Sequence, residues 1–301
     1  MRKALKWIVF VIAGLLVALA ALALAANWLA ERKRMRVIEL AVAPLPYVSD
    51  AAAIARGKYL YESRGCMECH GSDGAGSDVV NDPGGMYVHS PNISPGPGSV
   101  VNAYTEVDWV LAIRHGVSPQ KHPLFLMPSK DYSRLTDTDL AAIIAYARSL
   151  PAATGGGATV RLPFVVKALY AAGAVKDDAE QIDHTLPPPA PVPEAISVDH
   201  GAYVARMCTG CHGDGLSGGK IPGSPPDWPP AANLTPGTDS AMARYPSDAA
   251  FASMLRTGKR PDGTAVSEVM PFTTLGKLND TDVSAIYVYL KAVRPRPAGN
   301  R

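Results

Sequence analysis

The sequence has few cysteines and little net charge. Only four of its 301 residues are cysteine, and all four lie in two copies of one pentapeptide, so none remains for a disulfide or metal site elsewhere. The formal net charge of +2 is too small to indicate a protein that binds nucleic acid. Glycine and proline are abundant instead, with 27 of each, which is typical of loop-rich domains. The length predicts about two domains.

The two pentapeptides are CMECH at residues 66–70 and CTGCH at residues 208–212. The pattern Cys-x-x-Cys-His is typical of covalent attachment of c-type haem. Two thiols at this spacing can add to the two vinyl groups of one haem, and the next histidine then becomes the proximal iron ligand. A redox dithiol needs no such histidine, and zinc sites rarely repeat it on both copies. The sequence therefore predicts two covalently bound haem c groups, which would supply much of the core. Their attachment points are Cys66, Cys69, Cys208 and Cys211, and their proximal ligands are His70 and His212.

One long apolar run lies near the N-terminus, from Trp7 to about Trp28, after the basic residues Arg2, Lys3 and Lys6. A helix over this run would be roughly 33 Å long, close to the ~30 Å core of a bilayer. We therefore predict an uncleaved transmembrane anchor within residues 1–36. A cleaved signal peptide that ends near Ala25 is the alternative, although its apolar region would usually be only about 7–15 residues long. Because thioether attachment takes place outside the bacterial cytoplasm, we expect a single-pass inner-membrane protein whose haem domains face the periplasm.

The remainder of the chain contains an internal repeat. The segment NISPG at residues 92–96 matches NLTPG at residues 233–237, and LTDTD at 135–139 matches LNDTD at 278–282. The repeat predicts two copies of one domain, over residues 50–151 and 195–295, each with the order helix, haem loop, helix, methionine loop, helix.

The last helix of each copy has a clear start. Thr136 is a favourable N-cap with Asp139 three residues later, and Asn279 with Asp282 repeats this design. Tyr146 recurs as Tyr289, and we expect both tyrosines to pack between the first and last helices. Gly57 and Gly201 are expected to permit a close crossing of those helices.

Met127 and Met270 are the candidates for the distal iron ligands. Each lies beyond the haem motif of its copy and precedes a proline and the last helix. Ligation by histidine and methionine raises the reduction potential and saturates the iron, which suits electron transfer. The competing residues have no counterpart in the other copy; they are Met86, His89, His115 and His122 in the first copy and Met242 and Met254 in the second.

Two further pairs recur in the repeat. Arg114 and Arg256 precede the methionine loops, where a guanidinium could pair with a haem propionate or simply be a solvated arginine at a helix end. Asn92 and Asn233 could close a loop around the propionate edge, and a plain Asx turn is the alternative.

Together, the paired haem motifs, the Asn-(Ile/Leu)-(Ser/Thr)-Pro turns and the Met-Pro segments resemble the class I cytochrome c fold over residues 50–295. More narrowly, the chain is similar to bacterial membrane-anchored multihaem cytochromes, including the cytochrome subunits of periplasmic alcohol, aldehyde and gluconate dehydrogenases. The resemblance implies an all-α protein of two tandem cytochrome c domains, with the four cysteines, two histidines and two methionines named above as its haem-binding residues.

Residues 152–194 form the expected linker between the domains. Gly155–Gly157 open it, and the proline-rich segment 187–193 closes it as a stiff spacer. The apolar stretch from Leu162 to Val175 predicts a short helix. We expect this helix to dock the two haem domains together; the alternative is that it lies on the membrane surface.

The sequence thus predicts an electron-transfer protein that relays single electrons in a periplasmic respiratory chain and is not itself an enzyme. Its expected donor is a dehydrogenase or a quinol-oxidising complex, and its expected acceptor is an oxidase or a soluble cytochrome. A dihaem peroxidase is the enzymatic alternative, but it needs one haem with a free sixth position, which two matched methionines oppose. A soluble carrier released by signal cleavage is the other alternative.

Overall fold

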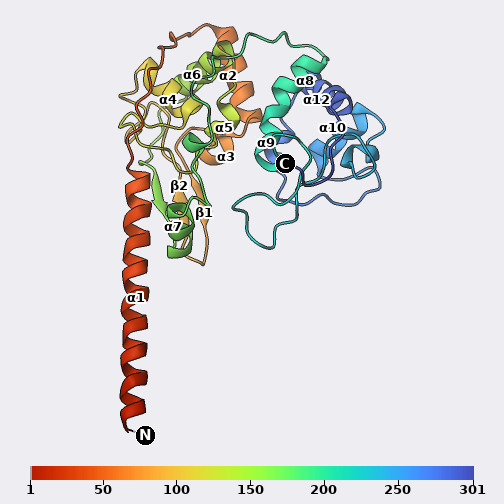
Figure 1. Ribbon diagram of the computed structural model, residues 1–301. Coiled ribbons are helices and arrows are strands. Elements are labelled where there is room, and N and C mark those ends of the chain that lie inside the picture. Colours follow the sequence, from red (N-terminus) through yellow and green to blue (C-terminus); the bar gives the residue numbers. More distant parts are fainter. Residues whose placement is uncertain (1) are drawn as a thin grey trace.

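A computed structural model describes residues 2–301, which form one long N-terminal helix and two helical domains beside each other (Figure 1). Helix α1 spans Arg2–Arg34 and extends away from the domains. The most apolar 18-residue stretch of α1 has a mean hydropathy of 3.0, and the rest of the chain does not cover it. Helix α1 is therefore long and apolar enough to cross a membrane.

The two domains repeat one order of elements. The first contains α2 (Ala51–Ser63), α3 (Cys66–His70), α4 (Glu106–His115), α5 (Ser129–Tyr132) and α6 (Asp137–Ser149). The second contains α8 (Val198–Val204), the 3-10 turn η2 (Ala205–Cys208), α9 (Thr209–His212), the 3-10 turn η3 (Ala241–Arg244), α10 (Asp248–Thr257), α11 (Phe272–Leu275) and α12 (Asp280–Ala292). The predicted order of helix, haem loop, helix, methionine loop and helix is therefore present in both copies.

The first and last helices of each domain cross at a glycine. A Cβ atom on Gly57 would lie 1.9 Å from the carbonyl oxygen of Ala142 in α6, and one on Gly201 would lie 2.0 Å from that of Ala285 in α12. No side chain fits in either gap, which confirms the expected close crossings. Tyr146 packs edge-on against the ring of Tyr61 across the first crossing, with 5.3 Å between the ring centres.

The last helices begin where the sequence indicates. The Thr136 hydroxyl accepts a hydrogen bond from the backbone N–H of Asp139 at 3.1 Å, and the Asn279 side chain accepts one from that of Asp282 at 2.7 Å. These bonds satisfy free N–H groups of the first helical turn. The Asp139 and Asp282 carboxylates do not turn back to their own N-caps and instead bind residues of the first helices.

A small antiparallel sheet departs from the all-helical expectation. Its order is β1 (Asp78–Asn81), β2 (Tyr87–His89) and β3 (Thr159–Arg161). Strands β1 and β2 form a hairpin within the haem loop of the first domain, whereas β3 belongs to the predicted linker. Pairing of Val88 with Val160 therefore attaches the start of the linker to the first domain.

The expected linker helix is present as α7 (Phe164–Ala171), followed by the 3-10 turn η1 (Asp178–Glu180). The expectation that it docks the two haem domains together is wrong, because α7 packs beside α1 (Figure 1). The Lys167 ammonium group lies 3.0 Å from a carboxylate oxygen of Glu31 and donates to the side chain of Asn27 at 2.8 Å. These polar contacts attach the linker to the C-terminal end of α1.

Candidate haem-binding sites

An apolar cavity in the first domain contains the predicted haem residues. Its lining includes Cys66, Cys69 and His70 of α3 and Met127 of the methionine loop, so two separate segments of the domain meet there. The other walls are largely aliphatic and aromatic and include Tyr61, Val88, Val100, Trp109, Phe125, Tyr132 and Ile143. An apolar cavity with a few converging ligand atoms is the usual form of a cofactor site. The residues of the first domain therefore fit a haem.

Both motif histidines are oriented by a backbone carbonyl. His70 Nδ1 donates to the carbonyl oxygen of Pro91 at 3.1 Å, and His212 Nδ1 donates to that of Ala232 at 2.7 Å. Burial lowers the pKa of both imidazoles, which keeps them neutral at pH 7. A neutral ring whose Nδ1 carries the proton presents Nε2 to a metal, as histidine ligands of metal sites usually do.

The motif cysteines are poor candidates for redox thiols. Burial raises the pKa of Cys66 and of Cys208 to about 12, since a thiolate is disfavoured in an apolar environment. Reactive redox cysteines have the opposite property, a pKa below the ordinary value. The pKa values of these thiols therefore do not indicate a redox dithiol.

Met127 and Met270 occupy the same backbone turn in the two domains. The N–H of Ser129 donates to the carbonyl of Met127 at 2.8 Å, and the N–H of Phe272 donates to that of Met270 at 2.8 Å. Met127 lines the haem cavity, and Met270 packs against the core of the second domain. The methionine loops are thus built alike, as the repeat predicts.

The competing ligands have other surroundings. Met242 and Met254 are buried in the core of the second domain. His115 contacts His184, with 3.0 Å between their Nδ1 atoms. His89 lines the cavity wall, but its Nδ1 pairs with Asp78 at 2.7 Å. Of the remaining two, His122 faces the carbonyl oxygen of Arg36, and Met86 does not line the cavity.

The two arginines of the repeat both pair with a carboxylate. Arg114 is buried and donates to the carbonyl of Leu135 at 3.0 Å and to Asp137 at 2.7 Å. Arg256 is exposed and pairs with Asp280, which matches Asp137 in the repeat. Each arginine thus connects the end of one helix to the carboxylate at the start of the last helix. Their pairing with a haem propionate stays a prediction.

Asn92 and Asn233 form Asx turns. The Asn92 carbonyl oxygen accepts from the N–H of Ser94 at 2.8 Å, while its amide donates to the carbonyl of Ala153 at 2.9 Å. Asn233 makes the matching bonds, to the N–H of Thr235 and to the carbonyl of Arg296, both at 2.9 Å. Each buried asparagine thus holds the haem loop against the chain that follows the last helix.

Two tyrosines connect the domains reciprocally. The Tyr59 hydroxyl of the first domain donates to Asp282 of the second at 2.6 Å. The Tyr203 hydroxyl of the second domain donates to Asp139 of the first at 2.6 Å. Each hydroxyl also accepts from the N-cap of the helix it touches, from Asn279 at 3.2 Å and from Thr136 at 3.3 Å.

The two carboxylates at this interface also bind basic side chains. Fully buried Asp282 accepts from Arg64 of the first domain at 2.8 Å and from His200 at 2.7 Å. Burial alone would raise the pKa of Asp282, but the Arg64 guanidinium and the hydrogen bonds lower it below its usual value. Arg56 holds Asp139 with two hydrogen bonds of 2.9 and 3.0 Å. The interface therefore has paired charges, as a stable buried polar contact requires.

The haem-attachment helices also contact the opposite domain. Glu68 in α3 accepts a hydrogen bond from Thr274 in α11 of the second domain. Asp131 in α5 lies so close to Gly210 in α9 that a Cβ on this glycine would be 2.8 Å from a carboxylate oxygen. Thr274 and Asp131 are matched positions, each four residues after its methionine. Both attachment segments therefore lie at the domain interface.

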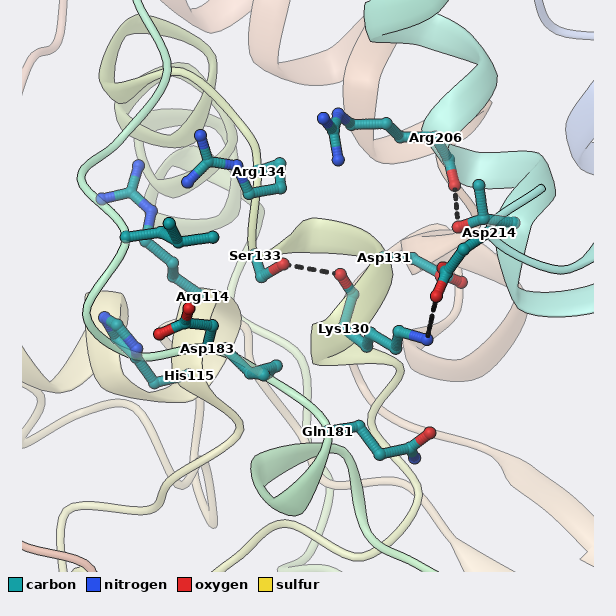
Figure 2. Close-up of a pocket in the computed structure, with 13 residues that line it drawn as sticks. Arg114, His115, Lys130, Asp131, Ser133, Arg134, Gln181, Asp183, Arg206 and Asp214 are labelled. Carbon is teal, nitrogen blue, oxygen red and sulfur yellow. Dashed lines mark hydrogen bonds and ion pairs between the residues drawn. The ribbon is translucent and has the colours of Figure 1, made fainter. Parts of the chain in front are cut away.

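A second, polar cavity of about 350 Å³ opens beside this contact (Figure 2). Lys130 of the first domain crosses it to contact Asp214 of the second at 3.4 Å. Arg134 and Arg206 also line it, from the first and second domain respectively. Burial, and then the nearby Asp178, raise the pKa of Asp131 to about 7 in this setting. Since charges of both signs line the cavity, it is a polar cleft between the domains and not a second haem pocket.

The sequence alone does not reveal that Tyr59 and Asp282, or Tyr203 and Asp139, are partners across the interface. The sequence does mark these four residues as repeated positions. Both tyrosines follow the crossing glycine by two residues, and both carboxylates lie three residues after an N-cap. Their repetition was visible, but contact between the two copies was not.

Two tandem helical domains, each with a Cys-x-x-Cys-His segment on a haem loop and a Met-Pro loop before its last helix, define a c-type cytochrome with duplicated domains. The chain belongs to the cytochrome c family, whose family model matches residues 54–151 and again residues 199–294. Domains of this family carry covalently bound haem c.

Curated relatives cover most of this chain. The fructose dehydrogenase cytochrome subunit of Gluconobacter japonicus is 28% identical over 279 residues, covering 83% of this chain and 54% of the relative. The cytochrome c subunit of the quinone alcohol dehydrogenase of Gluconobacter oxydans is 26% identical, covering 83% and 57%. The gluconate 2-dehydrogenase cytochrome c subunit of Pantoea cypripedii is 28% identical, covering 82% and 61%. The chain thus spans somewhat more than half the length of these relatives.

Proposed function

We propose that this protein is a dihaem cytochrome c that relays single electrons from a dehydrogenase partner to a downstream acceptor. Haem c supplies a one-electron iron couple when it is bound. The observation that carries the relay is the contact of each attachment helix with the opposite domain, through Glu68 with Thr274 and through Asp131 with Gly210. This arrangement supports electron transfer from one haem to the other inside one chain.

The residue roles follow the repeat. Cys66, Cys69, Cys208 and Cys211 would attach the two haems, and the Nε2 atoms of His70 and His212 would bind the irons on one side. Met127 and Met270 would bind on the other side. The carbonyls of Pro91 and Ala232 would keep each imidazole in one tautomer and orientation. Apolar walls such as those formed by Trp109 and Ile143 exclude water from the first site.

A dehydrogenase is the proposed electron donor, because the relatives that match the chain are cytochrome subunits of dehydrogenases. The proposed acceptor is an oxidase or a soluble cytochrome. We further propose that α1 is an uncleaved anchor in the bacterial inner membrane, with both haem domains on the periplasmic side. Its uncovered apolar surface supports this placement.

Intact-mass analysis of the purified chain tests the number of haems. The mass should exceed that of the polypeptide by two haem groups. The double variant Cys66→Ala with Cys69→Ala should lose only one of them. A wild-type mass with a single haem would contradict the proposal for one domain.

Near-infrared spectroscopy of the oxidised protein tests the distal ligands. The weak charge-transfer band from methionine sulfur to iron should be present, and Met127→Ala and Met270→Ala should each remove about half of it and lower the potential of that haem. Met242→Ala is the matched control, because Met242 is buried in the core, and it should leave the band unchanged. A band that survives Met127→Ala or Met270→Ala would exclude that residue as a ligand.

Purification in mild detergent with subunit identification tests the donor. A co-purifying dehydrogenase subunit that reduces the haems when its substrate is added supports the relay. Rapid reduction of the isolated chain by quinol, with no other subunit present, would contradict this choice of donor. Fast turnover of peroxide would contradict the electron-transfer role.

A further inference from the structure

Helix α7 has an exposed apolar face. Phe164, Val165 and Leu169 are exposed by 51%, 64% and 43%, although all three are large hydrophobic residues. They are the first, second and sixth residues of α7, and at the helical spacing of 3.6 residues per turn they share one side of this helix. Tyr170 is completely buried on another side. Three such side chains gathered on one short helix call for an apolar partner.

The position of α7 along α1 indicates what this partner is. Lys167 of α7 contacts Asn27 and Glu31 of α1. These residues lie where the apolar run ends, next to Trp28. Aromatic residues at such an end usually lie at the boundary between acyl chains and headgroups. Helix α7 therefore lies beside the level at which α1 leaves the bilayer, and Figure 1 shows it beside α1 below the body of the first domain.

The contact between α7 and α1 is firmly held. Lys33 donates to the carbonyl of Tyr170 at 3.0 Å. Arg36 makes two hydrogen bonds of 2.6 and 2.7 Å to Asp177, and the Tyr170 hydroxyl donates to the same carboxylate at 2.6 Å. The exposed face of α7 is thus fixed in height relative to the anchor.

We propose that α7 lies in the outer interface of the phospholipid bilayer, with Phe164, Val165 and Leu169 inserted among the lipids. The proposal rests on the membrane anchor given under the proposed function. A short amphipathic helix can lie in the plane of the interface with its apolar side buried below the headgroups. The lipid surface is favoured as the occupant because Leu24 and Trp28, which are apolar and exposed, lie in the same turn of α1 as Asn27, to which Lys167 of α7 donates.

Helix α7 is also connected to the first haem site through the side chain of Tyr170. The Tyr170 ring packs edge-on against Phe125, with 5.1 Å between the ring centres. Phe125 in turn lines the haem cavity. A helix that lies in the interface therefore sets the height and orientation of the first haem above the bilayer, which a single flexible tether would leave free.

Site-directed spin labelling tests the proposal on the full-length holoprotein. The native cysteines are occupied by haem, so an introduced cysteine is the only free thiol. Nitroxide labels are placed at Phe164→Cys and Val165→Cys in α7, at Leu15→Cys in α1 and at Ile196→Cys, an apolar residue 61% exposed at the start of the second domain. The protein is reconstituted into vesicles of phosphatidylethanolamine and phosphatidylglycerol, and an unchanged Soret band shows that each variant is folded.

The readout is the collision of each label with oxygen, which concentrates in lipid, and with a water-soluble nickel chelate. Labels at 164, 165 and 15 should collide severalfold more with oxygen than with nickel, and the label at 196 should show the reverse. Nickel access at both 164 and 165 while 15 stays in lipid would overturn the proposal and leave the anchor standing. Nickel access at 15 would overturn the anchor and the proposal with it. Exclusion of both reagents at 164 and 165 would show a protein partner on this face and would also overturn it.

Discussion

Removal of the Tyr59 hydroxyl is expected to weaken the contact between the two haem domains. In the variant Tyr59→Phe, the buried carboxylate of Asp282 loses a hydrogen bond of 2.6 Å. The N–H of Asn279 loses its acceptor at the same time. A hydrogen bond to a charged group contributes about 1.5–3 kcal/mol, and a buried donor or acceptor that is left unpaired costs a similar amount. Because Arg64 and His200 still hold Asp282, we expect a loss near the lower half of this range, ~2 kcal/mol.

The assay is thermal unfolding of the detergent-solubilised holoprotein, followed by circular dichroism and by the Soret band. A change of ~1 kcal/mol shifts Tm by about 2–4 °C in a cooperative unit of 150–250 residues, so Tm should fall by roughly 4–8 °C. Tyr203→Phe should have an effect of the same size, since Tyr203 binds Asp139 and Thr136 in the same manner. In the double variant the domains should unfold in two separate transitions.

Tyr146→Phe is the matched control. The Tyr146 ring packs on Tyr61 inside the first domain, and its hydroxyl makes no hydrogen bond to any residue in the range 2–301. Its Tm should change by less than ~2 °C, because the packing of the ring is retained. Equal shifts for Tyr59→Phe and Tyr146→Phe would refute the reasoning that the cross-domain hydroxyl stabilises the protein.

Three other predictions concern separate parts of the fold. Gly57→Ala should lower the free energy of unfolding by ~3 kcal/mol or more, because the new Cβ would overlap the carbonyl of Ala142. Gly156→Ala is the control: there is free space around Gly156, so this variant should have little effect on denaturant unfolding. Asp131→Asn should stabilise the protein at pH 8 and leave its stability unchanged at pH 3.5. Burial raises the pKa of the Asp131 carboxyl from 3.8 to about 7. Ionisation of this carboxyl therefore opposes folding as the pH rises from 3.8 to about 7, and asparagine cannot ionise. Equal effects at both pH values would contradict this. Burial, together with His184 and Arg114, lowers the pKa of His115 from 6.5 to about 4, so stability should fall as the pH falls from 6.5 to 4, and His115→Asn should flatten this part of the stability curve.

Much of this architecture can be predicted from local sequence. The helix crossings at Gly57 and Gly201 follow from a repeated glycine, and the starts of α6 and α12 follow from N-cap residues. Such signals act within a few residues, and the duplication shows each of them twice. The haem motifs are equally local, because the chemistry fixes the spacing of the cysteines and the histidine.

Contacts between distant segments could not be predicted in this way. The pairing of β3 with β2 joins a linker strand to a haem-loop hairpin some 70 residues earlier, and short strands of this kind carry little pattern of their own. Arg114 was open to two interpretations because a guanidinium suits a propionate as well as a carboxylate, and only the fold shows that Asp137 lies within reach. The apolar stretch of α7 suited a domain interface as well as a membrane surface, and only the fold shows that it packs beside α1.

The reciprocal tyrosine contact has a consequence for how such a chain can arise. Each domain carries both halves of the contact, a tyrosine in its first helix and a carboxylate at the start of its last helix. A single domain with these two residues could therefore pair with an identical copy around a two-fold axis, because such an interface is self-complementary. Fusion of the two copies through a linker would turn that dimer into one polypeptide, in which matched positions such as Asp131 and Thr274 can differ.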